Sequence, residues 1–126
     1  MGVDLGTKRV GIAISDPDGV IAFPRDIFDA DPNVPEKILS LARSEGATAI
    51  ILGESKDFKG QDNPIMQDVY ALKAYLEASH MPVYLESETF SSVEARRSRE
   101  DQRPIDASAA AIILQSFLDS SVKKAL

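Results

Sequence analysis

The residues of this chain that could do chemistry are acids from separate segments, namely Asp4, Glu54, Glu86, Glu88 and Asp106. Carboxylate oxygens are the ligands that Mg²⁺ and Mn²⁺ prefer, and such sites keep positions open for water and a substrate phosphate. Metal ions held in this way activate water and stabilise the leaving oxygen of a phosphodiester. These residue types therefore predict metal-dependent hydrolysis, if the fold brings the segments together.

Other kinds of site are limited, because the chain has no cysteine and a single histidine, His80. Disulfides, thiolate metal sites and a cysteine nucleophile are excluded. A serine–histidine–aspartate triad would have to use His80, which lies in the segment Ser-His-Met-Pro where a helix is expected to end. Such positions favour a solvated loop histidine, so the chemistry must rest on the carboxylates.

Each acid also has a plainer interpretation. Asp4 could cap a turn, since Gly6 follows it closely. Asp106 could be a helix cap that complements the helix dipole. Glu54, Glu86 and Glu88 could simply be solvated. Spacing along the chain does not decide among these roles, so the elements that carry the acids must be considered.

Antiparallel strands are expected in the first part of the chain. Apolar residues alternate over 9–15, which predicts a strand, and 2–5 can pair with it through a turn at 6–8. Asp-Pro-Asp-Gly at 16–19 predicts a tight turn into a further strand over 20–23, which Pro24 places at a sheet edge.

Helices and buried strands alternate in the rest of the chain. Stripes of apolar residues at helical spacing and capping residues predict helices over 34–45, from 62–64 onward, over 91–98 and from 105–106 onward. Short apolar runs predict strands over 49–52 and 82–85. The polar segments 54–61 and 99–104 are expected to be loops.

This order of elements predicts an α/β fold with a five-stranded mixed sheet, three antiparallel strands followed by two parallel ones, flanked by helices. Sites in such sheets form beyond the carboxyl ends of the parallel strands. Asp4 lies near the end of the first strand, Glu54 follows the fourth, and Glu86 and Glu88 follow the fifth. Asp106 opens the final helix. The fold is therefore expected to gather the acids at one rim.

Length and composition agree with a single domain over 1–126. The hydrophobic content of 44% and charged content of 27% are ordinary for a globular protein. No apolar run approaches the roughly 18 residues of a membrane span, and no export leader is evident. We therefore expect a cytoplasmic protein with no membrane association.

The net charge of −6 opposes strong general affinity for nucleic acid. Phosphate binding depends on lysines and arginines that displace counterions, so a nucleic-acid partner would require a local basic patch and bound cations. Lys8, Arg9 and Arg96 are the candidates for phosphate contacts, together with Arg97, Arg99 and Arg103. A solvated helix face is the alternative for most of these arginines.

Three blocks, GVDLGTKRVGIAISD, ESETFSSVEAR and IDASAAAIILQSFLD, resemble the signature blocks of the YqgF/RuvX family, in the same order over nearly the whole chain. These are Holliday junction resolvase-like proteins, also described as nucleases of pre-16S ribosomal RNA. The resemblance implies an RNase H-like fold and a nuclease that uses Mg²⁺ or Mn²⁺. It further implies precursor rRNA or branched DNA as the partner, bound by a monomer or homodimer.

The resemblance also implies three metal ligands, Asp4, Glu88 and Asp106. The middle block departs from the family's Asp-Glu-Arg, since Ser87 and Thr89 flank its glutamate. That departure leaves Glu86 as a rival for the second ligand. Glu54 is a weaker candidate, because the polar segment that it opens replaces a proline-containing stretch.

Two other functions compete with the nuclease. A catalytically impaired nucleic-acid- or protein-binding module of the same fold is favoured by the altered middle block and by the acidic charge. The turn Asp-Leu-Gly-Thr also occurs in sugar-kinase-like and actin-like ATPases. Those proteins need a second phosphate loop and a second domain, for which this chain offers no segment.

Overall fold

The computed structural model describes residues 1–54, 65–87 and 107–125. Its strands are β1 (Gly2–Leu5), β2 (Arg9–Ser15), β3 (Ala22–Asp29), β4 (Ile50–Glu54) and β5 (Val83–Ser87). Its helices are α1 (Val34–Ser44), α2 (Met66–Ala78) and α4 (Ala107–Ala125). No helix among these residues is long and apolar enough to cross a membrane.

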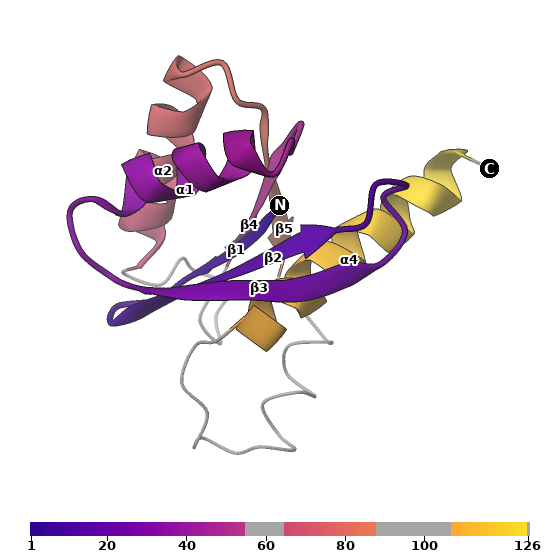
Figure 1. The fold of residues 1–126 in the computed structure, drawn as a ribbon, viewed down its shortest axis with the longest axis horizontal. Coiled ribbons are helices and arrows are strands. Elements are labelled where there is room, and N and C mark those ends of the chain that lie inside the picture. The colour runs from indigo at the N-terminus through magenta and orange to yellow at the C-terminus, as the bar shows by residue number, and fades with distance from the viewer. Residues whose placement is uncertain (55–64, 88–106, 126) are drawn as a thin grey trace.

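The strands form one five-stranded sheet in the order β3-β2-β1-β4-β5. β1 and β2 pair antiparallel, as do β2 and β3, whereas β4 runs parallel to both β1 and β5. Helices α1 and α2 cover one face of this sheet, and α4 crosses the other face (Figure 1). The predicted mixed sheet of three antiparallel and two parallel strands is therefore confirmed.

Alternation along the strands divides the core between the two faces. Val3, Ile12 and Leu52 are buried in the cluster that includes the apolar stripes of α1 and α2. Ala13 and Ile51 are buried instead against α4, with Ala110, Ile113 and Leu114 as the helix side of that cluster. Alternate residues of β2 and β4 thus point to opposite layers.

Gly2 allows α4 to approach β1 closely. A Cβ atom at this position would lie 2.8 Å from the Leu114 Cβ and 2.9 Å from the Ala110 carbonyl oxygen. The absence of a side chain in β1 therefore sets the distance at which the helix packs on the sheet.

Helices α1 and α2 end in the same way, with a residue in the left-handed conformation. Gly46 follows α1 with φ 74°, and the Ala47 N–H donates to the Ala42 carbonyl at 2.8 Å. His80 follows α2 with φ 66°, and the Met81 N–H donates to the Leu76 carbonyl at 3.0 Å. His80 is exposed, as predicted from its position after the helix.

The prediction for the third strand was wrong in extent, because β3 spans Ala22–Asp29 rather than 20–23. Polar residues break the alternation after Phe23, yet pairing with β2 continues to Asp29 through a bulge. Pro24 lies at the sheet edge as predicted. The Ile27 N–H donates to the Asp26 carboxylate at 2.8 Å, so a side chain satisfies a backbone donor of this edge strand.

The other predicted elements agree with the structure where it describes them. Strands β4 and β5 each extend two residues beyond the predicted ends, to Glu54 and Ser87. The sequence predicts a stripe of Ile65, Val69, Leu72 and Leu76 for α2. The last three are buried in the helix, whereas Ile65 is its half-buried N-cap residue and Met66 is buried in addition. The predicted start of α2 at 62–64, the helix over 91–98 and the loop over 99–104 lie outside the described residues.

Candidate functional site

Asp4 is the only charged residue that is buried within the described segments, with 5% of its surface exposed. It lies in β1 between the buried Val3 and the partly buried Leu5. Burying a carboxylate is unfavourable unless hydrogen bonds or positive charge compensate it. Asp4 therefore has a placement that is typical of a functional carboxylate.

Glycines flank Asp4 on both neighbouring strands. Asp4 pairs with Gly11 of β2. On the other side Val3 pairs with Leu52, so the next residue of β4, Gly53, is the neighbour of Asp4. Neither glycine has a side chain to occupy the sheet surface beside the carboxylate.

Glu86 of β5 lies in the same cross-strand row as Asp4 and Gly53, a row being the residues that are neighbours on adjacent strands. It pairs with Gly53, and its carboxylate Oε2 accepts a hydrogen bond of 2.7 Å from the Ser116 hydroxyl of α4. The preceding row, Val3, Leu52 and Leu85, packs toward α1 and α2. Alternation therefore places Asp4 and Glu86 together on the α4 face.

Helix α4 begins near the end of β1 that carries Asp4. Ala110 and Leu114 lie against Gly2, whereas Phe117, further along the helix, lines a pocket at the Met1 end of the strand. The helix thus runs back along β1, and its first turn starts at Ala107 on the Asp4 side. The helix N-terminus provides a positive dipole end there.

Several of the predicted site residues lie outside the described residues, namely Glu88, Arg96, Arg97, Arg99, Arg103 and Asp106. Within the described ones, no group of three or more histidine, cysteine, aspartate or glutamate residues is placed to hold a metal ion. The three-carboxylate site therefore stays a prediction, of which the structure describes the Asp4 part.

Lys8 lies in the turn that directly follows β1, as predicted, and Arg9 is the first residue of β2. The Gly6 N–H donates to the Arg9 carbonyl at 3.0 Å, and the Ala30 N–H donates to the Lys8 carbonyl at 2.9 Å. Both basic side chains are exposed. Lys8 and Arg9 therefore place two cations at the same end of β1 as the Asp4 carboxylate.

Glu54 is separated from Asp4 by the sheet itself. It is the residue after Gly53 in β4, so strand alternation directs its half-buried side chain toward the α1 and α2 face. Of the two alternative ligands considered from the sequence, Glu86 shares a face with Asp4 and Glu54 does not.

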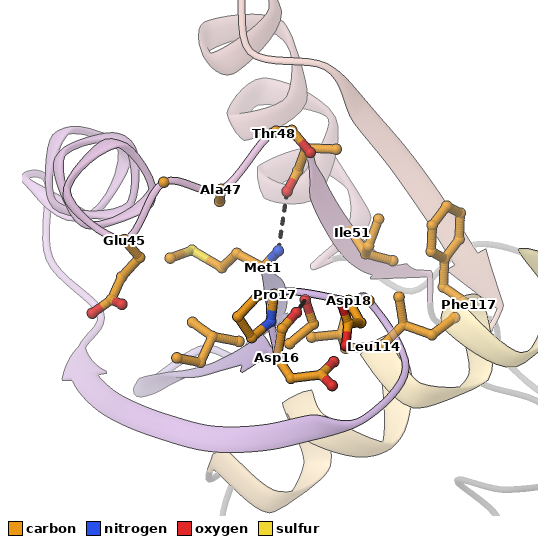
Figure 2. Close-up of a pocket in the computed structure, with 16 residues that line it drawn as sticks. Met1, Asp16, Pro17, Asp18, Glu45, Ala47, Thr48, Ile51, Leu114 and Phe117 are labelled. Atoms are coloured by element: carbon orange, nitrogen blue, oxygen red, sulfur yellow. Dashed lines mark hydrogen bonds between the residues drawn. The ribbon is translucent and has the colours of Figure 1, made fainter.

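Two pockets of about 660 Å³ lie apart from the Asp4 carboxylate. Figure 2 shows the first, at the Met1 end of β1, where Leu114 and Phe117 of α4 form one wall. The second lies on the α1 and α2 face, and its lining includes Leu5, Thr7, Asp31, Asp68 and Tyr75. Neither pocket contains a predicted metal ligand.

The Asp16 carboxylate, at the first pocket, serves the turn between β2 and β3. It accepts hydrogen bonds from the Ile21 N–H at 3.1 Å and the Val20 N–H at 2.8 Å. These bonds favour the charged form and lower the pKa of Asp16 below its usual value. Its geometry is accounted for by the turn that the sequence Asp-Pro-Asp-Gly predicts.

Sequence reasoning missed Ser116 and the row that joins Asp4 to Glu86. Ser116 is one of several small polar residues in the last helix, and its partner is 30 residues away. Gly53 marks the end of an apolar run in the sequence, but only the register of β4 shows that it separates two carboxylates.

Comparison with known proteins places the chain in a family. A family model described as "RuvX: Holliday junction resolvase" matches residues 1–120. A protein of Pelotomaculum thermopropionicum named "Putative pre-16S rRNA nuclease" is 36% identical, over 95% of this chain and 86% of that protein. One of the same name from Maridesulfovibrio salexigens is 31% identical, over 94% of this chain and 96% of that protein.

Solved structures of resolvases share the fold. RuvC of Thermus thermophilus in complex with Holliday junction substrate superposes with a TM-score of 0.62 at 15% identity, covering 96% of this chain and 93% of that one. The Fowlpox virus resolvase in complex with Holliday junction DNA gives a TM-score of 0.54 at 15% identity, covering 94% of this chain and 97% of that one. The predicted RNase H-like fold is therefore confirmed, and the chain belongs to the RuvX family, as its three sequence blocks indicated.

Proposed function

We propose that this RuvX-family chain is a divalent-metal-dependent nuclease that hydrolyses phosphodiester bonds of structured nucleic acid. The observation that carries the proposal is the buried Asp4, which lies in the first family block at the carboxyl end of β1. The names of its relatives, which refer to pre-16S rRNA, favour precursor ribosomal RNA as the substrate.

Asp4, Glu88 and Asp106 are the proposed ligands of the metal. All three are hard oxygen donors, so their chemistry suits Mg²⁺ or Mn²⁺. When bound, such a metal supplies an activated water and a positive charge for the leaving oxygen. Asp4 belongs to β1, the central strand of the sheet, and a ligand carried on a strand is held more precisely than one carried on a loop.

Lys8 and Arg9, with Arg96, are the proposed phosphate contacts. The side chains of Lys8 and Arg9 are exposed where the turn after β1 enters β2, and their carbonyls accept hydrogen bonds from the Ala30 and Gly6 N–H groups. Because the chain carries a net charge of −6, attraction for a polyanion must come from such local cations. This turn would hold phosphates close to the metal ligands.

Nucleic-acid binding without cleavage is the second candidate. Ser87 and Thr89 stand where the resemblance implies an aspartate and an arginine, so the site lacks two groups of the family block. A module of this kind would bind substrate but would neither need nor use the metal for cleavage.

A cleavage panel separates these functions. The chain would be incubated with a precursor 16S rRNA segment and with a four-way DNA junction, in Mg²⁺, in Mn²⁺ and in chelator, with Asp4→Asn as the control variant. We expect the unmodified chain, and not Asp4→Asn, to cleave in the presence of metal, most strongly on the RNA. Binding of either substrate without cleavage in any metal would contradict the nuclease and support the binding module.

A further inference from the structure

We propose that Glu86 is a further metal ligand, which binds the same metal ion as Asp4 from the other side of Gly53. This inference rests on the proposed function, since it concerns the metal of that site. It adds to the family's three predicted ligands a carboxylate that the described part of the structure places on the Asp4 face.

The register of three parallel strands places the backbones of the two acids at a separation that one ion can bridge. Glu86 pairs with Gly53, which is in turn the neighbour of Asp4. Strands lie about 4.8 Å apart, so the two Cα atoms are roughly 10 Å from each other. An aspartate and a glutamate side chain that converge on a metal at about 2.1 Å can span this separation.

The residue between them is a glycine, which places no side chain between the two acids. Any other residue at Gly53 would place its Cβ on the α4 face, between the Asp4 and Glu86 carboxylates. Gly11, on the opposite side of Asp4, likewise carries no side chain. The row therefore has carboxylates at two positions, and neither Gly53 nor Gly11 contributes a side chain beside them.

Ser116 is the positioning residue for Glu86. Its hydroxyl donates to Oε2 at 2.7 Å, which fixes one carboxylate oxygen and leaves Oε1 for another partner. The hydroxyl is neutral, so it orients the carboxylate without cancelling its charge. Metal-binding carboxylates are commonly held in this way by an outer hydrogen bond.

Packing between β5 and α4 holds this pair in place. Tyr84, two residues before Glu86 and on the same face, stacks on Phe117 with ring centroids 5.3 Å apart. Phe117 is the neighbour of Ser116 in α4, so the aromatic contact and the hydrogen bond anchor the same segments. Glu86 is consequently half-buried beside the helix rather than free in solvent.

Direct Mn²⁺ binding tests the inference without substrate. Free Mn²⁺ would be measured by electron paramagnetic resonance in titrations of the unmodified chain, Asp4→Asn, Glu86→Gln and Ser116→Ala. Glu77→Gln is the matched control, because Glu77 pairs with Lys73 on α2, on the other face of the sheet. Thermal unfolding of each variant would establish that it is folded. The amide of Glu86→Gln keeps an oxygen that can accept the Ser116 hydrogen bond.

Glu86→Gln and Asp4→Asn are each expected to weaken Mn²⁺ affinity by at least about 10-fold. Ser116→Ala should weaken it less, and Ser116→Thr, which retains the hydroxyl, should restore it. Affinity unchanged in Glu86→Gln but lost in Asp4→Asn would overturn the role of Glu86 and leave the proposed function standing. Affinity unchanged in both variants, or no Mn²⁺ binding by the unmodified chain, would overturn both.

Discussion

Asp4 and Glu86 lie on the same face of the sheet and in the same row, with only the side-chain-free Gly53 between them. The first belongs to the central strand and the second to the edge strand β5. Two parallel strands thus carry these proposed ligands, and α4 packs on the same face of the sheet, where it contacts Gly2 and Glu86.

Gly53→Val should weaken Mn²⁺ binding because it inserts a branched side chain between these carboxylates. Valine has high strand propensity, so the main effect is expected on the site rather than on β4. Manganese titration together with circular dichroism would check this. A folded Gly53→Val chain that binds Mn²⁺ as tightly as the unmodified one would contradict the proposed arrangement.

Gly2→Ala should destabilise the fold by about 1–3 kcal/mol, the usual cost of overpacking. The added Cβ would meet the Leu114 Cβ at 2.8 Å and the Ala110 carbonyl oxygen at 2.9 Å, and neither atom can rotate away. Urea unfolding measures the change in the free energy of unfolding. An unchanged unfolding midpoint would contradict this prediction, because it would show that α4 can move away from β1 at no cost in stability.

The two helix ends should respond to substitution in opposite directions. Gly46→Ala should lower stability by about 1 kcal/mol, because alanine disfavours φ near 74° although no atom lies within 4 Å of the new Cβ. His80→Gly should raise stability by up to about 1 kcal/mol, because it relieves the same conformation at φ 66°. The unfolding temperatures of both variants would test these predictions. A loss of stability in His80→Gly would contradict the second one, because it would show that the His80 side chain contributes more stability than its backbone conformation costs.

Asp16 should make stability depend on pH in the acid range. Its pKa is lowered in the folded chain by the Ile21 and Val20 N–H groups, so its stabilising effect is complete above the unfolded-state pKa. That effect is lost as pH falls through the lower, folded-state pKa. The stability difference between the unmodified chain and Asp16→Asn should therefore shrink below about pH 4.

Denaturant unfolding at a series of pH values would measure this difference. Asp18→Asn is the matched control, because Asp18 lies exposed in the same turn. A difference for Asp16→Asn that stays constant between neutral pH and about pH 3 would contradict the role assigned to its carboxylate.

Lys8→Ala and Arg9→Ala should weaken binding of the RNA substrate and lower its dependence on salt. Each lost phosphate contact is expected to reduce the slope of log affinity against log salt by about 1. Fluorescence anisotropy at several salt concentrations would measure both quantities. Lys73→Ala, whose ammonium pairs with Glu77 on α2, is the control, and an equal loss in that variant would assign the effect to overall charge.

The sequence predicts the fold well where apolar periodicity is strong. Strand β2 has the predicted bounds, and the antiparallel meander follows from the two turns around it. Strand β3 continues further along the chain than predicted, because the segment that follows Pro24 shows no alternation of apolar and polar residues. Their strand conformation comes from hydrogen bonds with β2, a tertiary effect that local propensity does not contain.

The candidate site was predicted in part. Asp4 and the basic turn follow from the first family block and from the end of the first strand. The role of Glu86 depends on strand register and on Ser116, which is 30 residues away in sequence. Register and long-range hydrogen bonds arise from packing, so a pattern of residues along the chain names Glu86 as a candidate but does not orient it.

Asp4 is proposed to hold the metal of a nuclease site, and the cleavage rate of Asp4→Asn tests this role most directly. Single-turnover cleavage of the precursor 16S rRNA segment would be measured in Mn²⁺ for the unmodified chain and for the variant, with equal folding shown by circular dichroism. Removing an outer-shell partner of a metal ligand typically lowers metal affinity or activity by about 10–100-fold. Loss of the ligand itself should therefore slow cleavage by at least about 100-fold. A folded Asp4→Asn chain that cleaves at the unmodified rate would contradict the metal site proposed for this protein.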